Sequence, residues 1–259
     1  MTNSIQGKTM LITGASSGIG KATAIACAQA GMNVVLTARR RKQLEALQEE
    51  IGGTTKIIVG DVTEDGFNEK LLRATGTFDA VFINAGHGID QHTLDMNMKD
   101  VRSLFELNVF AAIELASLCA KQFKEQGSGH IILCASCLSK FATPKHGVYC
   151  ASKSAIEAFG KSMRMELKSS NINVSTLHPI GTRTEFFKSS ESRSGTTHSS
   201  FEELAPSWLM QPPERVANAV VKCLRKPKPE IWTSLFMRIV STLFSAFPRL
   251  AQFFTSRFG

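Results

Sequence analysis

The stretch Thr9-Met-Leu-Ile-Thr-Gly-Ala-Ser-Ser-Gly-Ile-Gly20 decides the fold of this 259-residue chain. A short apolar run over residues 9–13 predicts a buried strand, and the three glycines that follow predict a tight turn into a helix over residues 19–30. Glycine allows the sharp turn, and the free N–H groups at a helix N-terminus attract a pyrophosphate. A strand, a glycine-rich turn and a helix in this order therefore indicate a dinucleotide-binding unit.

Apolar strands and amphipathic helices alternate along the rest of the chain. We expect further strands over residues 33–38, 56–59, 79–83, 129–134, 172–177 and 230–233. The helices expected between and after them cover residues 40–51, 64–74, 100–124, the stretch around Tyr149, and 213–224. Short apolar strands separated by helices predict a parallel sheet that is covered on both faces. The expected fold is therefore α/β, a single-domain, doubly wound Rossmann-type sheet of about seven strands.

The composition is that of an ordinary folded domain, with 43% hydrophobic and 20% charged residues. The N-terminus lacks the basic and apolar segments of a signal peptide, so we expect a cytoplasmic protein. Cys134-Ala-Ser-Cys137 matches C-x-x-C, but no second pair or histidine cluster completes a zinc site. We therefore expect reduced structural thiols and no metal.

Positive charge is concentrated at the C-terminal end of the chain. The net charge is +8, and residues 222–259 contain seven basic residues against one acidic residue, Glu230. The basic residues are Lys222, Arg225, Lys226, Lys228, Arg238, Arg249 and Arg257. Because the rest of the chain is nearly neutral, a nucleic-acid partner is not expected.

The end of the second expected strand indicates which dinucleotide would bind. Proteins that bind NAD place an acidic residue there, about 20 residues after the glycine turn, on the ribose 2′-OH. In this chain Ala38 is followed by Arg39-Arg40-Arg41. Three guanidinium groups suit a 2′-phosphate, whereas three cations that merely begin a helix oppose the helix dipole. We therefore expect NADP(H) rather than NAD(H), with a solvated basic helix start as the alternative.

Tyr149 and Lys153 lie four residues apart, so a helix places both side chains on one face. An apolar stripe continues that face through Ile156, Gly160, Met163 and Leu167. A buried lysine is costly unless it is paired. A cation about 4 Å from a phenol would lower its pKa of about 10 by about three units. The pair is therefore a candidate acid/base catalyst, although a packed tyrosine beside a lysine is the alternative when the pair is considered alone.

Together these features resemble a classical short-chain dehydrogenase/reductase over residues 5–234. The resemblance rests on Thr13-Gly14-x-x-x-Gly18-x-Gly20, Asp61-Val62, Asn84-Ala85-Gly86, Asn108, Ser136 and Tyr149-x-x-x-Lys153. It implies that Asn108, Ser136, Tyr149 and Lys153 are catalytic and that Ser136 and Tyr149 also hold the substrate. In the family, Ser136 would orient the substrate oxygen, Lys153 would hold the nicotinamide ribose, and Asn108 would support a proton-relaying water.

The resemblance and the motifs also assign the cofactor site. The expected cofactor-binding residues are Gly14, Ser16, Ser17, Gly18, Ile19, Gly20, Arg39, Arg40, Asp61, Val62, Asn84, Ala85, Gly86, Tyr149, Lys153, Pro179, Thr182 and Thr184. Asp61 and Val62 would hold the adenine, and the segment after Pro179 would face the nicotinamide. Ile180 departs from the glycine that is usual in the family and would not readily take a positive φ.

The activity implied by the resemblance is an NADP(H)-dependent interconversion of a carbonyl compound and an alcohol, with Tyr149 as general acid/base. The expected partners are a small-molecule substrate and further copies of the chain in a dimer or tetramer. The alternative is a non-catalytic regulatory protein of the same fold that binds NADP(H). The four catalytic residues argue against that alternative, because a protein that only binds the cofactor does not need them.

Two segments stand apart from the catalytic pattern. Residues 182–213 form a long, serine-rich segment, which is typical of a substrate lid. Its apolar residues Phe186, Phe187, Trp208 and Met210 suggest an apolar or lipid-like substrate.

We expect residues 1–234 to be the catalytic domain and residues 235–259 to be an apolar and basic helical extension. One face of its helix, which Pro248 would end, contains Phe236, Ile239, Val240, Leu243, Phe244 and Phe247. Closure of the substrate pocket, a dimer contact and a membrane contact all stay open for it.

Overall fold

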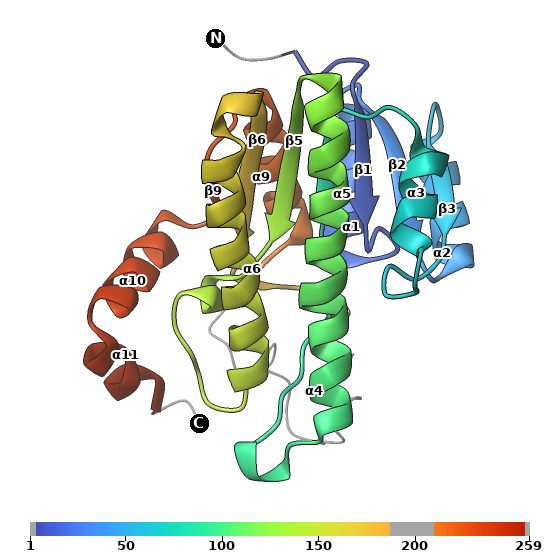
Figure 1. The fold of residues 1–259 in the computed structure, drawn as a ribbon. Helices are drawn as coiled ribbons and strands as arrows, with labels where there is room; N and C mark the ends of the chain where they lie inside the picture. The colour runs from blue at the N-terminus through green and yellow to red at the C-terminus, as the bar shows by residue number, and fades with distance from the viewer. Residues whose placement is uncertain (1–3, 187–209, 257–259) are drawn as a thin grey trace.

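The computed structural model describes residues 4–186 and 210–256 of the chain (Figure 1). A seven-stranded sheet has the order β3-β2-β1-β4-β5-β6-β9, and all neighbouring strands are parallel. Its strands are β1 (Thr9–Thr13), β2 (Asn33–Ala38), β3 (Lys56–Val59), β4 (Ala80–Ile83), β5 (Gly129–Cys134), β6 (Ile172–His178) and β9 (Glu230–Trp232). The predicted doubly wound parallel sheet, including its last edge strand, is confirmed.

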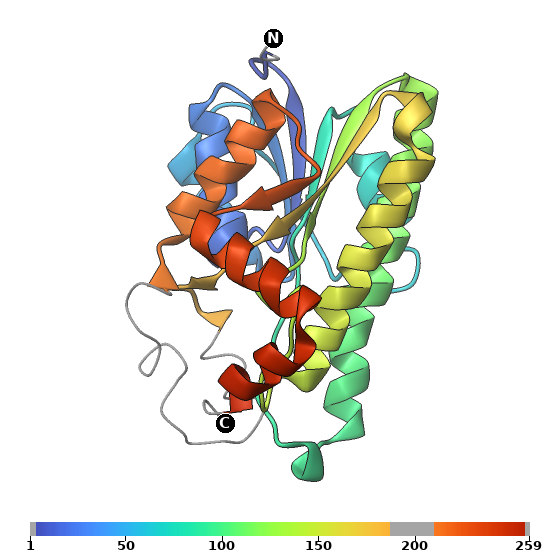
Figure 2. The same cartoon turned by 90° about the vertical axis from the view of Figure 1, so that its left-hand side faces the viewer.

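Helices cover both faces of this sheet (Figure 2). One layer contains α1 (Gly18–Gln29), α2 (Arg41–Ile51) and α9 (Pro213–Arg225), and the other contains α3 (Phe67–Thr75), α5 (Ala111–Gln126) and α6 (Gly147–Glu166). Side chains alternate between the two faces of a strand. Met10 and Ile12 accordingly pack in the first core, whereas Leu11 packs in the second. This alternation explains why the strands are apolar at nearly every position.

The strand order reverses between β1 and β4, which lie side by side in the sheet although β2 and β3 separate them in the chain. The backbone N–H groups of Asn84 and Ala85 both donate to the Thr13 hydroxyl at 3.0 Å. These bonds tie the turn after β1 to the turn after β4. Ligands of open parallel sheets bind at this kind of reversal, beyond the carboxyl ends of the strands.

The helix expected over residues 100–124 is present but not regular. It consists of α4 (Met98–Phe105), a π-helical turn (Glu106–Phe110) and α5, and it runs on to Gln126. Asn108 lies within the π-helical turn and is almost fully buried. π-helical turns are rare and frequently occur at functional sites.

The chain ends in two short helices rather than the single helix that the sequence suggests. Pro248 ends α10 (Leu235–Ala246) but also begins α11 (Pro248–Thr255), where a proline at the first helical position is favourable. Figures 1 and 2 show both helices outside the two helical layers. Their buried side chains are Met237, Ser241 and Ala251, so the rest of the two-helix segment contributes little to the core.

Several short elements complete the fold. β7 (Gly181–Thr182) and β8 (Met210–Gln211) pair in a separate two-stranded sheet. The single 3₁₀ turns are Thr93–Asp95, Cys137–Ser139 and Lys168–Ser170. The predicted lid, residues 182–213, begins in β7 and runs through β8 to Pro213, the first residue of α9. Its residues 187–209 lie outside the described part of the chain.

Candidate active site

The turn between β1 and α1 forms a cradle that only glycines fit. Gly14 and Gly18 have positive φ angles of 64° and 53°. A Cβ atom on Gly14 would lie 2.9 Å from the Cα of Ala85, and one on Gly20 would lie 2.3 Å from the carbonyl oxygen of Gly14. Real Cβ atoms do not approach other heavy atoms this closely, so the three glycines allow the turn to pack against the segment after β4.

The N-terminus of α1 opens into this cradle. Among the described residues, no side chain caps the helix at Ser17, and its first turn contains no acidic residue. The first N–H groups of a helix have no partner within the helix and lie at the positive end of its dipole. Together with the glycines, they form a site that suits the pyrophosphate of a dinucleotide. The residues Gly14, Ser16, Ser17, Gly18, Ile19 and Gly20 therefore come together as the sequence predicts.

Of the three consecutive arginines, Arg40 contacts this cradle and Arg39 contacts the segment after β3. The Nε atom of Arg40 donates to the Ser16 hydroxyl at 3.1 Å, and an Nη atom of Arg40 pairs with Glu185 at 2.9 Å. Arg39 pairs with Asp61 at 3.3 Å. Arg41 instead pairs with Glu45 along α2, so it points away from the cradle.

Asp61 follows β3 and is held in its ionised form. Burial by itself would raise the pKa of its carboxyl, but the hydrogen bonds from Thr63 and the nearby Arg39 outweigh burial and hold the pKa below its usual range. Val62 and Ala85 line, with Thr13, a small hollow between the neighbouring turns. The predicted adenine-side residues thus lie at the same edge of the sheet as the glycine turn.

The catalytic candidates lie beyond β4 and β5. Lys153 is buried on α6, and its Nζ atom donates to the Cys134 carbonyl at 2.8 Å and lies 5.8 Å from the centre of the Tyr149 ring. A Cβ atom on Gly86 would lie 2.9 Å from Oδ1 of Asn108 and 3.5 Å from Nζ of Lys153. Gly86 therefore separates two of the catalytic candidates and leaves room only for a residue without a side chain.

Three hydrogen bonds fix the side chain of Asn108. Its Oδ1 atom accepts from the His87 backbone N–H at 3.0 Å, and its Nδ2 atom donates to the His87 carbonyl at 2.9 Å and to the Ser152 hydroxyl at 3.3 Å. The Ser152 hydroxyl in turn donates to the Tyr149 carbonyl at 2.8 Å. These bonds connect the π-helical turn with the helix that carries Tyr149 and Lys153.

The pKa of Tyr149 departs from the sequence-based expectation. Burial raises the pKa of the phenol well above its ordinary value, neighbouring thiols add to this effect, and the hydrogen bond with Ser136 opposes it. Burial also lowers the pKa of Lys153. The expectation that Lys153 lowers the pKa of Tyr149 is therefore wrong for this arrangement, because burial dominates. A raised pKa keeps the phenol protonated at neutral pH, which is the form that donates a proton.

The segment after β6 carries the remaining predicted cofactor contacts, and only some of these residues lie near the glycine turn. The carbonyl of Pro179 accepts from the Cys137 N–H at 3.0 Å, and Ile180 is buried without a positive φ. The Thr182 hydroxyl donates to the Ile180 carbonyl at 2.8 Å, so its proton is used inside the small sheet. Thr184 instead lies against the glycine turn, where a Cβ atom on Gly18 would be 3.0 Å from its Cγ2 atom.

An aromatic side chain covers the phenol from the lid side. The rings of Tyr149 and Phe186 meet edge to face with their centres 5.5 Å apart. Met210 is buried in β8 at the other end of the lid. Phe187 and Trp208, the other two apolar lid residues that the sequence singles out, lie outside the described residues.

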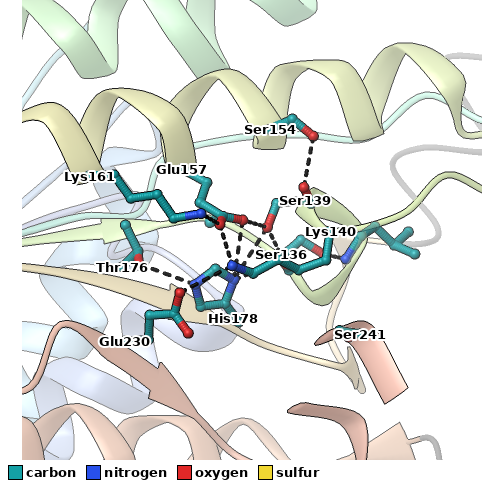
Figure 3. Close-up of polar contacts among 12 residues, drawn as sticks. Ser136, Ser139, Lys140, Ser154, Glu157, Lys161, Thr176, His178, Glu230 and Ser241 are labelled. Carbon is teal, nitrogen blue, oxygen red and sulfur yellow. Dashed lines mark hydrogen bonds and ion pairs between the residues drawn. The ribbon is translucent and has the colours of Figure 1, made fainter. Parts of the chain in front are cut away.

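The structure adds residues near Ser136 that the sequence did not single out. His178, Glu157 and Lys140 form buried contacts around the segment that follows Ser136 (Figure 3). Glu157 lies four residues after Lys153, so its position on the buried face of α6 was a signal that could have found it. No sequence pattern indicates that Lys140 reaches both Glu157 and Glu230.

The described residues hold no group of three or more His, Cys, Asp or Glu side chains that could bind a metal ion. All six cysteines are free thiols, including the pair at Cys134 and Cys137. Burial raises the pKa of Cys137 to about 11, so this thiol stays protonated and is a poor nucleophile.

The parallel sheet and its glycine turn define a Rossmann-type protein. Comparisons with known proteins identify the family within this class. The short chain dehydrogenase profile matches residues 8–195. Dehydrogenase/reductase SDR family protein 7-like of Drosophila melanogaster is 29% identical over 247 residues, which cover 90% of this chain and 74% of that protein. D-erythrulose reductase of Gallus gallus is 33% identical over 183 residues, which cover 70% of this chain and 74% of that protein.

A solved structure extends this similarity to the fold. The 3-ketoacyl-(acyl-carrier-protein) reductase from Brucella melitensis, complexed with NADH, has a TM-score of 0.76 and 25% identity over 86% of this chain and 93% of that one. The chain therefore belongs to the short-chain dehydrogenase/reductase family of oxidoreductases. Members of this family act on small molecules and commonly form oligomers.

Proposed function

We propose that the protein is an NADP(H)-dependent carbonyl reductase, or the corresponding alcohol dehydrogenase, in which Tyr149 is the general acid/base. The carrying observation is a chain of contacts: Asn108 and Lys153 lie beside Gly86, Lys153 lies near the Tyr149 ring, and Tyr149 shares a hydrogen bond with Ser136. The cradle suits a dinucleotide because its glycines allow the tight turn and the uncapped N-terminus of α1 offers free N–H groups to a pyrophosphate. A reduced nicotinamide supplies the hydride when it is bound.

The chain's own residues supply the proton and the orientation. In the reducing direction Tyr149 donates its phenolic proton to the developing alkoxide, and its raised pKa keeps that proton in place until then. Ser136, which shares a hydrogen bond with Tyr149, holds the substrate oxygen within reach of both hydroxyls. Lys153 lies close enough to hold the nicotinamide ribose and to stabilise the phenolate that remains.

The arginines support the preference for NADP(H). Arg40 already holds the Ser16 hydroxyl, and Arg39 lies beside Asp61, which is an adenine-side residue in the family. A 2′-phosphate between these groups would receive charge-assisted hydrogen bonds from two guanidinium groups. It would also compete with Glu185 for Arg40, because that ion pair is largely exposed.

The environment of Tyr149 favours an apolar or lipid-like substrate. Phe186 packs edge to face on the Tyr149 ring, so the substrate would meet an aromatic surface where it reaches the catalytic hydroxyl. The two reductases named above act on a ketose and on a fatty-acyl ketone by their names, which supports a ketone as the reacting group.

We further propose that residues 235–259 are an extension of the catalytic domain 1–234 that lies on an anionic phospholipid surface. Eight large apolar side chains on α10, on α11 and between them are each at least 43% exposed. They are Leu235, Phe236, Ile239, Leu243, Phe247, Leu250, Phe253 and Phe254. The apolar face that the sequence predicts is only partly exposed, because Val240 and Phe244 of that face are half-buried.

The charges of this segment identify the partner that the apolar face fits best. Residues 231–259 contain three arginines and neither aspartate nor glutamate. An amphipathic helix with this composition lies in the plane of an anionic membrane with its apolar face inserted. α10 has 12 residues, which is too short for the roughly 20 that cross a bilayer.

A substrate screen tests the proposed activity. The purified full-length protein is mixed with NADPH or NADH and a panel of ketones and aldehydes of increasing chain length, and oxidation of the cofactor is followed by absorbance. We expect turnover of apolar ketones with NADPH and at least about tenfold lower kcat/KM with NADH. A protein that binds NADPH tightly but turns over none of the compounds would contradict the enzymatic proposal and favour a regulatory cofactor-binding role.

A further inference from the structure

Two side chains contact the carbonyl oxygen of Ser136, one from the following turn and one from β6. The Nδ1 atom of His178 lies 3.1 Å from this oxygen, and the Ser139 hydroxyl lies 2.7 Å from it. His178 is fully buried at the end of β6, and its ring stacks on Trp232 with the two ring centres 4.5 Å apart. The backbone on either side of Ser136 therefore cannot shift without breaking these contacts.

The partners of His178 determine its protonation. A carbonyl oxygen can only accept a hydrogen bond, so Nδ1 must carry the proton that points to Ser136. The other nitrogen, Nε2, lies 3.1 Å from the Thr176 hydroxyl. Burial lowers the pKa of His178, which is consistent with a neutral ring. His178 thus acts as a fixed donor to the backbone of the catalytic serine.

A second set of contacts joins the same segment to α6 (Figure 3). Glu157 is buried on α6, and its carboxylate accepts from the Ser139 hydroxyl and pairs with Lys140. The Ser154 hydroxyl of α6 donates to the Ser139 carbonyl at 2.9 Å. Because α6 also carries Tyr149 and Lys153, these contacts connect the Ser136 segment to the helix on which the other catalytic side chains stand.

The charges around Glu157 are balanced. Lys140 and Lys161 both pair with its carboxylate, and Lys140 also pairs with Glu230 on β9 at 3.1 Å. Burial by itself would raise the pKa of Glu157, but the hydrogen bonds from Lys140, Lys161 and Ser139 together hold it below its usual range. Burying a carboxylate costs free energy that its partners must offset. Removing one partner of a buried ion pair therefore strongly destabilises the fold.

We propose that His178 and Glu157 are positioning residues for the catalytic serine. His178 fixes the Ser136 carbonyl to β6, while Glu157 fixes the following residues to α6, so that the Ser136 hydroxyl and the Tyr149 hydroxyl converge on one substrate oxygen. This inference rests on the proposed function, because the convergence matters only if a carbonyl reacts there. Neither residue contacts the reacting atoms, and both act through the backbone of residues 136–140.

Two variants of His178 separate positioning from packing. His178→Phe keeps a ring to stack on Trp232 but loses the donor to Ser136, whereas His178→Asn keeps an N–H donor and loses most of the ring. For a ketone that the wild type turns over, we expect His178→Phe to lose about tenfold to hundredfold in kcat, since small misplacements of reacting groups have effects of this size. His178→Asn should stay within about threefold of the wild type, and both should bind NADPH as the wild type does.

The outcomes distinguish this proposal from the proposed function. A His178→Phe enzyme with wild-type kcat, or equal losses in both variants, would overturn the positioning role while leaving the reductase assignment intact. If His178→Phe does not fold, Ser139→Ala, which removes the other side-chain contact to the Ser136 carbonyl, should lower kcat and leave the KM for NADPH unchanged. If the wild type turns over no ketone, the reductase assignment fails. Amide hydrogen exchange over residues 135–140 then tests the contact between His178 and the Ser136 carbonyl directly. We expect faster exchange in His178→Phe than in His178→Asn, and equal exchange in the two variants would contradict the positioning role.

Discussion

Helices α6 and α10 depart in opposite ways from the usual pattern of apolar side chains inside and polar side chains outside. α6 buries Ser152, Lys153 and Glu157, which are polar or charged, whereas α10 exposes large apolar side chains such as Phe236 and Leu243. Buried polar groups and exposed apolar patches are the informative exceptions in a folded protein, because each one costs free energy unless something compensates it.

The compensation is internal for α6, and we propose that it is external for α10. Lys153 donates to the Cys134 carbonyl, and Glu157 pairs with two lysines, so the chain itself satisfies the buried groups of α6. Large apolar side chains of α10 are exposed, and the proposed phospholipid surface would remove them from water. The comparison therefore contrasts buried polar groups that the protein satisfies itself with exposed apolar groups that a partner would cover.

The largest expected effect comes from removing the compensation inside α6. Glu157→Ala should lower the free energy of unfolding by about 3 kcal/mol, because it leaves Lys140 and Lys161 without their shared carboxylate in a mostly buried cluster. Chemical denaturation measures the change. Glu166→Ala is the matched control, since Glu166 is exposed on the same helix and should change stability by less than about 0.5 kcal/mol. A loss no larger than that of the control would contradict the account of α6.

The pH dependence of this effect has a definite sign. The pKa of Glu157 is lower in the folded protein than its ordinary value of 4.5, so its stabilisation is complete above about pH 4.5 and is lost as the pH falls through the folded value. The stability difference between the wild type and Glu157→Ala should therefore shrink in acid. A difference that grows below pH 4.5 would show that the paired carboxylate is not its source.

A smaller effect is expected from the outer face of α10. Replacing Phe236 and Leu243 together by serine should lower binding to vesicles of phosphatidylcholine and phosphatidylglycerol by about 30-fold, or about 2 kcal/mol. Full burial of such a side chain contributes about 1.5–3 kcal/mol, and Phe236 and Leu243 have only 57% and 45% of their surface left to bury. Vesicle sedimentation measures the partition. Leu94→Ser with Met165→Ser is the matched control, because these side chains are just as exposed elsewhere on the surface.

Two results would contradict the membrane assignment. One is equal vesicle binding by the double variant and its control. The other is a wild type that ignores vesicles but forms a dimer that the Phe236 and Leu243 replacements dissociate in sedimentation velocity, which would assign the face to a second copy of the chain.

The smallest predicted effect compares neighbouring arginines. Arg40→Ala should weaken NADPH binding by about tenfold and change NADH binding by less than about twofold, because only the 2′-phosphate needs the guanidinium group beside Ser16. Arg41→Ala is the control, since Arg41 pairs with Glu45 and should leave both affinities unchanged. Fluorescence titration measures the affinities, and equal losses for the two cofactors in Arg40→Ala would contradict the NADP(H) preference.

The sequence predicted the features that depend on local pattern. The apolar runs identify every strand of the main sheet, and the glycine spacing identifies the turn that packs against Asn84. The stripe through Ile156, Gly160 and Met163 is buried on α6 as expected. These predictions succeed because periodicity and glycine chemistry act over a few residues.

The features that the sequence did not predict depend on contacts between distant segments. The pairing of Lys140 with Glu230 joins residues 90 positions apart, and the bond from His178 to Ser136 spans 42 positions. The raised pKa of Tyr149 follows from the burial of the phenol, which no local pattern specifies. The π-helical turn at Asn108 likewise coincides with bonds to His87, 21 positions earlier in the chain.

The central claim is that Tyr149 transfers the proton in an NADPH-dependent carbonyl reduction. Steady-state turnover of the best ketone by the wild type and by Tyr149→Phe tests it most directly, with NADPH affinity and circular dichroism measured on the same samples. We predict that Tyr149→Phe loses about 10³-fold in kcat while it folds and binds NADPH as the wild type does, since general acid catalysis contributes about 10²–10⁴-fold. A Tyr149→Phe protein that reduces the ketone at the wild-type rate would contradict the claim.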